Sequence, residues 1–384
     1  MSNANSASTQ RRASPLRIAD RQKVEIMRAI ARNARVIIMD EPTSSLTADE
    51  AERLHKIIAV LRGAGRTVIY VTHFLDHVLA HCDRVTIMRD GKVIRTAPVA
   101  GETKETLVEA MLGEPADVAF PQIPPAPPDT ASPLLEVRDA TTRAGIRGVS
   151  IVVKAGEIVG LIGLVGSGRS ETLRAIFGAD RLLSGEIRIG DQLYANPSPH
   201  RSVRRGLVMI PEERRRQGLV MTQLVKANMS LPHLSSLNRF GILLEGEERK
   251  RTVHFIEHFD IVPPQVNGAI ALFSGGNQQK VLLSKWVYNS PKIVLLDEPT
   301  RGVDIGARRR IHQLVVELAR AGAAVVLVSS ELEEVIALSH RGYLLRRGEV
   351  IGQIDCHTSR VNDVLFRLFE ANRTALRPRP QAAI

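Results

Sequence analysis

The sequence predicts an α/β fold with parallel strands, present in one complete and one partial copy, and three observations support this. First, the run Val36–Thr43 recurs as Ile293–Thr300, an offset of 257 positions (Asp40 to Asp297). Second, helix and strand patterns alternate along the first copy, as in parallel β/α proteins. Third, a glycine-rich loop beginning at Gly163 follows a short apolar run, as a strand leads into a phosphate-binding turn.

The same offset relates three further pairs of motifs. These are Leu16–Lys23 with Phe273–Lys280, Val71–Phe74 with Val328–Glu331, and Arg89–Val93 with Arg346–Val350. Four agreeing offsets indicate a tandem duplication, which outranks other sequence signals. The equivalent of Gly163 would fall before Met1, so we expect the first copy to lack its glycine loop in this chain. We interpret this as a truncated gene product, a misassigned start or a frameshifted remnant.

The duplication and the composition together predict the domain organisation. Short apolar runs at 36–39 and 67–71 are predicted strands that would expose apolar faces without the missing part, leaving the first copy partly unfolded or sticky. The predicted segments are 1–15 (disordered), 16–113 (C-terminal part of the first copy), 114–133 (Pro-rich linker), 134–371 (complete second copy) and 372–384 (tail).

Composition excludes several classes of protein. Two cysteines give no disulfide framework, and no apolar run approaches the ~18–20 residues of a membrane span. The net charge of +11 could attract nucleic acid, but aromatic residues are only 4% of the chain. The arginine clusters Arg214–Arg216 and Arg308–Arg310 are not interleaved with aromatics, so we expect no nucleic-acid partner.

The glycine-rich segment has the spacing of a phosphate-binding loop. Glycines let backbone N–H groups converge on phosphate oxygens at a helix start, and a plain Gly-rich turn is the alternative. Ser170 is placed to bind Mg²⁺, whereas Arg169 stands where lysine is usual and cannot replace a compact ammonium group. We therefore expect nucleotide binding with poor catalysis. The predicted contacts are Gly163, Leu164, Val165, Gly166, Ser167, Gly168, Arg169, Ser170 and Glu171.

Two acidic pairs and one Ser-Gly-Gly turn complete the motifs. Asp297 is predicted to bind Mg²⁺ and Glu298 to face the attacking water, although two acids could merely cap a strand end. Asp40 and Glu41 occupy the equivalent positions in the first copy. A helix that opens with Ser274–Gly276 would present N–H groups and a hydroxyl to a phosphate.

These motifs, with His73 and Ser330 at equivalent strand ends, resemble the ATP-binding cassette of ABC proteins over about residues 16–371. The tandem arrangement, the segment Pro211–Arg214 and the arginine-containing loop are similar to the ATPase subunit of monosaccharide importers of ribose, xylose or galactose type. The resemblance implies a P-loop NTPase cassette, with a RecA-like core and a helical subdomain, that uses ATP and Mg²⁺.

The resemblance also implies two composite nucleotide sites. Site one would combine Asp40, Glu41 and His73 with Ser274, Gly275, Gly276 and Gln278; site two would combine Gly163–Ser170, Asp297 and Glu298 with Leu16–Gln22. In site two, Arg17, Ile18 and Ala19 replace Ser-Gly-Gly and Ser330 replaces histidine, which implies a regulatory or structural role. Glu212 takes the place of a glutamine that senses Mg²⁺ and contacts the membrane subunit.

The resemblance implies partners as well. It predicts integral-membrane permease subunits and a sugar-binding protein, with this chain peripheral on the cytoplasmic face of the inner membrane. A soluble tandem-cassette protein acting on ribosomes or DNA, and a non-hydrolysing remnant, are the alternatives. Two second copies could also pair as a cassette–cassette dimer.

Overall fold

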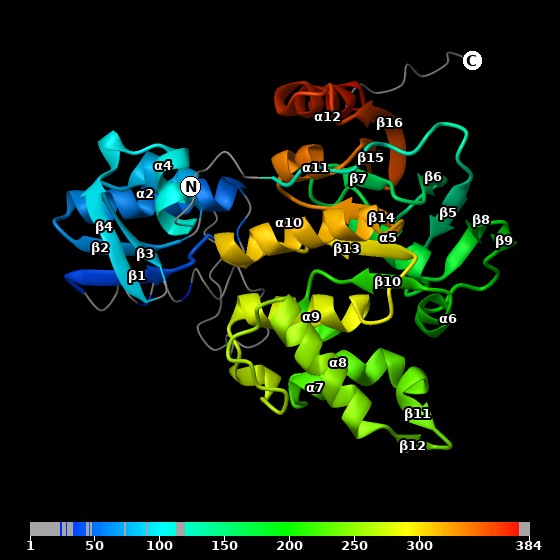
Figure 1. The fold of residues 1–384 in the computed structure, drawn as a ribbon. Coiled ribbons are helices and arrows are strands. Elements are labelled where there is room, and N and C mark those ends of the chain that lie inside the picture. The colour runs from blue at the N-terminus through cyan, green and yellow to red at the C-terminus, as the bar shows by residue number, and fades with distance from the viewer. Residues whose placement is uncertain are drawn as a thin grey trace, which may run out of the picture. The chain divides into compact units, whose positions relative to one another are not determined.

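The computed structural model divides the chain into two compact units, residues 1–117 (unit 1) and 118–384 (unit 2), and each is described by itself (Figure 1). The predicted site residue His73 and the segment Leu16–Gln22 lie outside the described residues. The structure describes Val24, Arg28 and residues 34–43, 46, 48–72, 74–89, 91–112 and 120–375.

Unit 1 contains two separate pairs of strands. β1 (Val36–Asp40) and β2 (Thr67–Val71) are parallel, as the sequence predicts, while β3 (Arg84–Arg89) and β4 (Lys92–Pro98) form an antiparallel hairpin. One face of β1 packs on α2 (Ala48–Gly63). The small core consists of Ile37, Met39, Leu54, Ile58 and Leu61. The remaining elements are α3 (Leu75–His81), a 3-10 turn at Val99–Gly101 and α4 (Lys104–Leu112).

Unit 2 is built on a six-stranded sheet with the order β10-β13-β14-β7-β15-β16. Its first five strands are parallel and β16 runs antiparallel at one edge. The central strands are apolar and buried on both faces, which requires cover on each side. The bounds are β7 (Ile158–Ile162), β10 (Leu207–Ile210), β13 (Ile293–Asp297), β14 (Ala324–Val328), β15 (Arg341–Arg346) and β16 (Glu349–Asp355).

One face of this sheet is covered by α5 (Arg169–Phe177) and a second, antiparallel sheet of order β6-β5-β8-β9. Side chains of α5 belong to a single apolar cluster with both sheets. The second sheet comprises β5 (Pro133–Thr142), β6 (Val149–Lys154), β8 (Leu182–Ile189) and β9 (Gln192–Leu193), and α6 (Pro199–Arg204) precedes β10.

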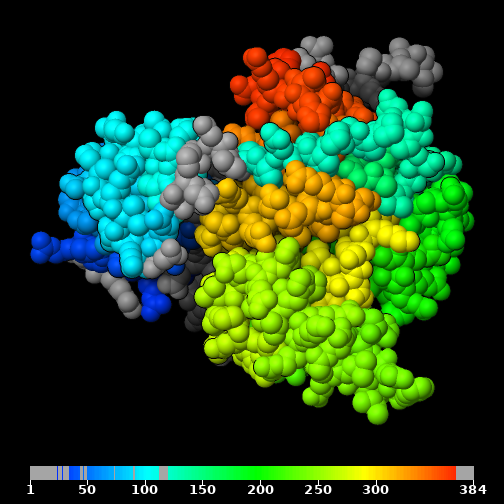
Figure 2. All heavy atoms as spheres, in the orientation of Figure 1, coloured from blue at the N-terminus to red at the C-terminus, as the bar shows by residue number. Residues whose placement is uncertain are grey.

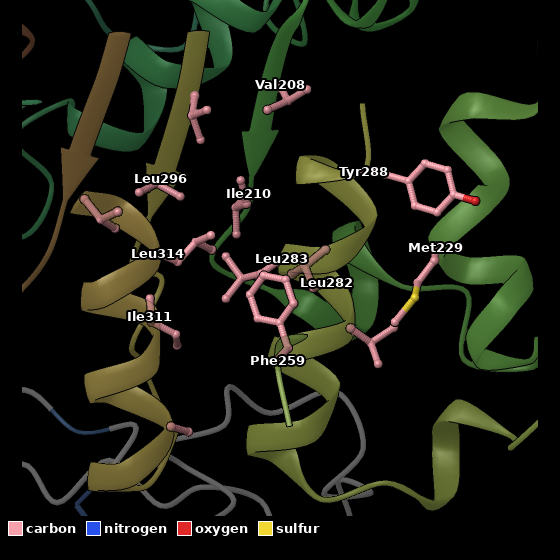
Figure 3. Packing of buried hydrophobic residues seen from close by; sticks show 14 of the residues in the cluster. Val208, Ile210, Met229, Phe259, Leu282, Leu283, Tyr288, Leu296, Ile311 and Leu314 are labelled. Carbon is pink, nitrogen blue, oxygen red and sulfur yellow. The ribbon is translucent and has the colours of Figure 1, made fainter. Parts of the chain in front are cut away.

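The other face packs against α9 (Gly275–Val287) and α10 (Ile305–Arg320). Figure 3 shows Leu296 and Ile210 of the sheet lying toward Leu314 of α10 and Leu283 of α9. The same cluster continues to Met229 and joins the sheet to a helical part. That part comprises a π-helical turn at Arg214–Gly218, α7 (Val225–Ser230), a 3-10 segment at Leu231–Leu237, α8 (Glu245–His258) and a 3-10 turn at Ile270–Leu272.

A short hairpin protrudes from the helical part in both whole-chain views (Figures 1 and 2). It is formed by β11 (Asn238–Arg239) and β12 (Ile242–Leu243), and Phe240 at its turn is 92% exposed. On the opposite side of unit 2, α11 (Leu332–Leu338) and α12 (Val361–Ala375) complete the fold.

The Pro-rich segment expected to link the copies packs on unit 2 over its described residues. The ring of Phe120 stacks on His312 with centroids 5.1 Å apart. The carbonyl oxygen of Gln122 accepts a hydrogen bond from Arg320, and that of Pro124 lies 2.8 Å from His340 Nε2. This part of the segment therefore belongs to unit 2 rather than spanning open solvent.

Candidate nucleotide-binding site

The glycine loop begins where β7 ends, at the carboxyl edge of the main sheet. Gly166 and Gly168 have φ values of 78° and 103°, in the left-handed region that disfavours a Cβ. A Cβ on Gly163 would stand 2.5 Å from the carbonyl oxygen of Leu345, so only glycine fits. Val165 at the tip is 86% exposed, and the loop is open to a ligand on that side.

The first turn of α5 brings the loop to the acidic pair. The helix begins at Arg169, directly after Gly168 of the loop. Ser170 Oγ donates a hydrogen bond of 2.9 Å to Oδ1 of Asp297, the last residue of β13. Burial raises the pKa of the Asp297 carboxyl group to about 6, although the bond from Ser170 opposes the shift.

Glu298 is held by Ser330 and Arg169, which stand where histidine and lysine are usual. The backbone N–H and the hydroxyl of Ser330 both donate to Oε2 of Glu298, at 2.9 and 3.0 Å. Arg169 Nη2 lies 3.8 Å from Oε1, and Nη1 donates to the carbonyl oxygen of Ser329. Burial raises the pKa of Glu298, opposed by Ser330 and Arg169. Both carboxylate oxygens are thus engaged by the protein itself.

The remaining groups of the loop fit a phosphate ligand and a metal ion. Ser167 Oγ is buried and has no hydrogen-bond partner in the part of the chain that the structure describes. The side chain of Leu164 in the same loop is exposed. The hydroxyl of Ser170 and the carboxylate of Asp297 are hard oxygen donors of the kind Mg²⁺ prefers. These residues can hold a nucleotide phosphate with Mg²⁺.

A buried polar network behind the site is absent from the sequence predictions. Oε2 of Glu334 accepts hydrogen bonds from Thr300 (2.8 Å) and Ser329 (2.6 Å), and Oε1 lies 2.8 Å from His312 Nε2. Glu334 is 1% exposed. Burial raises its pKa, but the bonds from His312, Ser329 and Thr300 outweigh burial and lower it. The network ties the residues after Glu298 to the strand end that carries Ser330. Only the spacing of polar residues on α10 and α11 could have suggested it.

The Ser-Gly-Gly turn lies at the start of α9. Ser274 caps the helix, and its Oγ accepts a hydrogen bond from the N–H of Asn277. A Cβ on Gly275 would stand 2.7 Å from Arg214 Nη2, so glycine leaves room for the guanidinium group. Gly276 is buried. Burial lowers the pKa of Arg214. The turn therefore places a cation beside a helix N-terminus, an arrangement suited to an anion.

Two other predicted contacts are engaged within unit 2. Gln278 is fully buried, and its Nε2 donates to the carbonyl oxygen of Phe273 at 2.9 Å. Its Oε1 accepts from Arg215 Nε at 3.3 Å, so the side chain supports the turn from inside. Glu212 forms an ion pair with Arg301, which follows the acidic pair in sequence.

The acidic pair of unit 1 repeats the backbone corner of unit 2. Glu41 has φ 46° and Glu298 has φ 50°, both in the left-handed region. The N–H of Glu41 donates to the carbonyl oxygen of Val71 at 2.9 Å, as the N–H of Glu298 does to Val328. Asp40 is exposed at the end of β1. The two corners share the same backbone geometry, as the offset of the repeat predicts.

Comparison with known proteins defines the class. A sequence profile of the ABC transporter family matches residues 146–301. The solved structure of an ATP-binding subunit of an ABC transporter aligns with TM-score 0.51 and 25% identity, covering 62% of this chain and 99% of that one. A dimeric bacterial ABC transporter cassette aligns equally well and covers 58% of this chain. The fold is that of an ATP-binding cassette, which confirms the predicted fold class.

Curated relatives specify the family. The ribose import ATP-binding protein RbsA of Rhodococcus jostii (strain RHA1) is 38% identical over 356 residues, covering 93% of this chain and 70% of the relative. The protein of the same name from Bacillus subtilis (strain 168) is 38% identical over 349 residues. The chain therefore belongs to the ABC transporter family, in the group of ribose import ATP-binding proteins. Among the residues that the structure describes, no helix is long and apolar enough to cross a membrane.

Proposed function

We propose that this chain is the energy-coupling subunit of an importer for simple sugars of the ribose class, and that it binds ATP with Mg²⁺. The observation that carries the proposal is the meeting of the glycine loop, Ser170 and Asp297 at the ends of β7 and β13. The ribose import names of the relatives support the substrate class. In this proposal residues 134–371 are a complete cassette and 16–113 part of a second one.

Different residues would bind the metal ion and the phosphates. Bound Mg²⁺ would neutralise and orient the terminal phosphates of the nucleotide. Ser170 and Asp297 would hold the ion, and Ser167 with the loop N–H groups would bind phosphate oxygens. Arg169 and Ser330 both contact the carboxylate of Glu298, so this carboxylate is poorly placed to orient a water molecule. We therefore propose slow hydrolysis at this site and a regulatory or structural role for it.

The faster site would be site one. It would use Asp40, Glu41 and His73 together with Ser274–Gly276 of a facing cassette. The retained backbone corner at Glu41 supports this assignment, and so does the dimeric cassette among the structural relatives. The partners would be permease subunits in the inner membrane and a sugar-binding protein, with this chain on the cytoplasmic side.

The test is nucleotide binding and hydrolysis by the purified chain. Binding of a fluorescent ATP analogue should require Mg²⁺ and should weaken about tenfold in Ser170→Ala, because a charge-assisted contact is lost. Hydrolysis should be slow in the wild type and no faster in Glu298→Gln. Absence of Mg²⁺-dependent binding would contradict the proposal. ATP-driven uptake of ribose, xylose or galactose into vesicles that contain the permease would identify the sugar.

A further inference from the structure

The Pro-rich segment at residues 120–128, called the strap below, places an aromatic ring on a buried histidine of unit 2. Phe120 stacks on His312 of α10, with ring centroids 5.1 Å apart and ring planes inclined by 23°. His312 is buried, and its Nδ1 has no hydrogen-bond partner among the residues that the structure describes. Phe120 is 36% exposed, so its ring lies between His312 and solvent.

A second buried histidine anchors the strap, so Phe120 is not held by stacking alone. His340 Nδ1 accepts a hydrogen bond of 2.9 Å from the N–H of Ile158, the first residue of β7. Its Nε2 therefore carries the proton and donates to the carbonyl oxygen of Pro124 at 2.8 Å. This bond fixes the backbone of the strap just after Phe120 and keeps the ring at its position.

On its other side, His312 contacts the buried carboxylate of Glu334. His312 Nε2 lies 2.8 Å from Oε1, and Oε2 accepts hydrogen bonds from Thr300 and Ser329. Because the pKa of Glu334 is lowered, the carboxylate is ionised and only accepts hydrogen bonds. Thr300 lies just after the acidic pair, and Ser329 directly follows β14. One carboxylate therefore ties these two segments together.

The segment after β14 holds Glu298 in place. The backbone N–H and the hydroxyl of Ser330 both donate to Glu298 Oε2. Ser329 Oγ accepts a hydrogen bond of 3.1 Å from the N–H of Glu331, and the Ser329 carbonyl oxygen accepts one from Arg169. A displacement of Ser329 would therefore weaken the contacts that engage the carboxylate of Glu298.

We propose that Phe120 is a positioning residue for the nucleotide site, and that it restrains hydrolysis by keeping Ser330 on Glu298. Its ring holds His312 against Glu334 and keeps water from Nδ1. Without the ring, water would solvate Nδ1 and His312 could turn away from Glu334. The fraction of molecules with a free Glu298 carboxylate would then rise, and turnover would rise with it. This inference rests on the proposed function, because it takes Glu298 as the group that orients water.

Hydrogen exchange of the full chain without nucleotide tests the positioning role. In Phe120→Ala the amides of Ser330 and Glu331 should exchange about three- to tenfold faster, the range expected for loss of one aromatic pair. Phe120→Tyr retains the ring and should restore the wild-type rates. Phe240→Ala is the matched control, because it removes an exposed ring of the hairpin that lies outside the network.

Nucleotide measurements test the effect on the reaction. The dissociation constant of Mg-ATP should change less than about twofold in Phe120→Ala, because Ser170 and Asp297 bond to each other outside the network. Turnover should rise by about the same three- to tenfold as the exchange rates, because both follow the open fraction. Adding Glu298→Gln to Phe120→Ala should abolish this gain.

Several results would overturn the inference. Unchanged exchange at Ser330 and Glu331 in Phe120→Ala would show that the strap does not position this segment, and equal acceleration in Phe240→Ala would show a non-specific effect. Unchanged or slower turnover, or a gain that persists with Glu298→Gln, would show that the contact does not restrain hydrolysis through Glu298. If no variant binds Mg-ATP, the proposed function fails, while the exchange rates still decide whether Phe120 positions Ser330.

Discussion

The two copies of the repeat contain similar apolar strands and bury them very differently. Leu295 in β13 is 0% exposed, whereas Ile38 at the equivalent position in β1 is 69% exposed. Val328 in β14 is also fully buried, and its equivalent Val71 is 47% exposed. The strand sequences alone do not account for this. In unit 2 the face is covered by α5 and the antiparallel sheet, and no described element covers it in unit 1.

The comparison teaches that an apolar strand sequence predicts a strand but not its burial. Burial depends on elements contributed by other segments of the fold, and stabilisation follows the area removed from water. The alternate residues Ile37 and Met39 are buried in unit 1 because α2 covers that side. Substitutions at equivalent positions should therefore have unequal effects.

The largest expected difference in stability comes from placing a charge at Leu295 of β13 and at the equivalent Ile38 of β1. Leu295→Asp should lower the free energy of unfolding by more than about 4 kcal/mol, because it buries an unpaired carboxylate and removes an apolar side chain. Ile38→Asp should change it by less than about 1 kcal/mol, because the side chain faces solvent. Chemical denaturation followed by circular dichroism measures both. Equal losses would mean that the face of β1 is covered in solution.

A second difference should appear at the polar network. Glu334→Ala should lower the free energy of unfolding by about 3 kcal/mol, because it leaves Thr300, Ser329 and His312 buried without their partner. The equivalent residue in unit 1 is His77, whose Nδ1 lies 3.3 Å from Thr43 Oγ1. His77→Ala should cost about 1 kcal/mol or less, because one partly exposed hydrogen bond is lost.

Thermal denaturation of the two variants provides the measurement. A matched control is Glu333→Ala on the same helix as Glu334, since Glu333 lies outside the network and should change the melting temperature little. If Glu334→Ala and Glu333→Ala melt together, the network does not contribute to stability.

The sequence predicts contiguous motifs better than contacts between them. The glycine loop, the acidic pair and the Ser-Gly-Gly turn are each set by local spacing, and the α/β fold is confirmed. The pairing of Arg169 with Glu298 depends on where α5 meets β13, which no local pattern contains. The sequence indicates that Ser330 replaces histidine, but its bonds to Glu298 follow from tertiary structure. Gln278 illustrates the opposite case, because its motif position suggested a ligand contact while its amide is buried.

A third, smaller effect should appear at the acidic pair itself. Asp297→Asn should raise the free energy of unfolding at neutral pH by about 1–2 kcal/mol, because the buried carboxylate is ionised at a cost. Because the pKa of Asp297 is raised, the folded state binds the carboxyl proton of Asp297 more tightly than the unfolded state does. The stability associated with the proton is present below about pH 4 and is lost as the pH rises through about 6.

Denaturation at pH 5 and pH 8 tests this effect. The gain from Asp297→Asn should be larger at pH 8. Asp40→Asn is the matched control, and it should change stability little because Asp40 is exposed. A destabilised Asp297→Asn protein at pH 8 would show that the carboxylate has a favourable partner in the folded state.

The smallest expected effect concerns the histidine in unit 1 that is equivalent to His312. Burial, followed by the neighbouring His81 and His77, lowers the pKa of His55 to about 4. Its ring stacks on His81 at 3.9 Å between centroids, and Nε2 lies 3.3 Å from the hydroxyl oxygen of Tyr70. The equivalent His312 has a carboxylate partner instead, so the two copies surround the same residue type with opposite charge environments.

Because the folded pKa of His55 is below the unfolded value, its contribution to stability is present above about pH 6.5 and is lost as the pH falls toward 4. Between pH 7 and pH 5 we expect a loss of about 1 kcal/mol in the opening free energy of α2, after allowance for solvent screening. His55→Gln should remove this pH dependence while leaving unit 2 unchanged. Hydrogen exchange of α2 amides in the full chain, corrected for intrinsic rates, measures it. The same pH dependence in His55→Gln would assign the effect to His77 or His81.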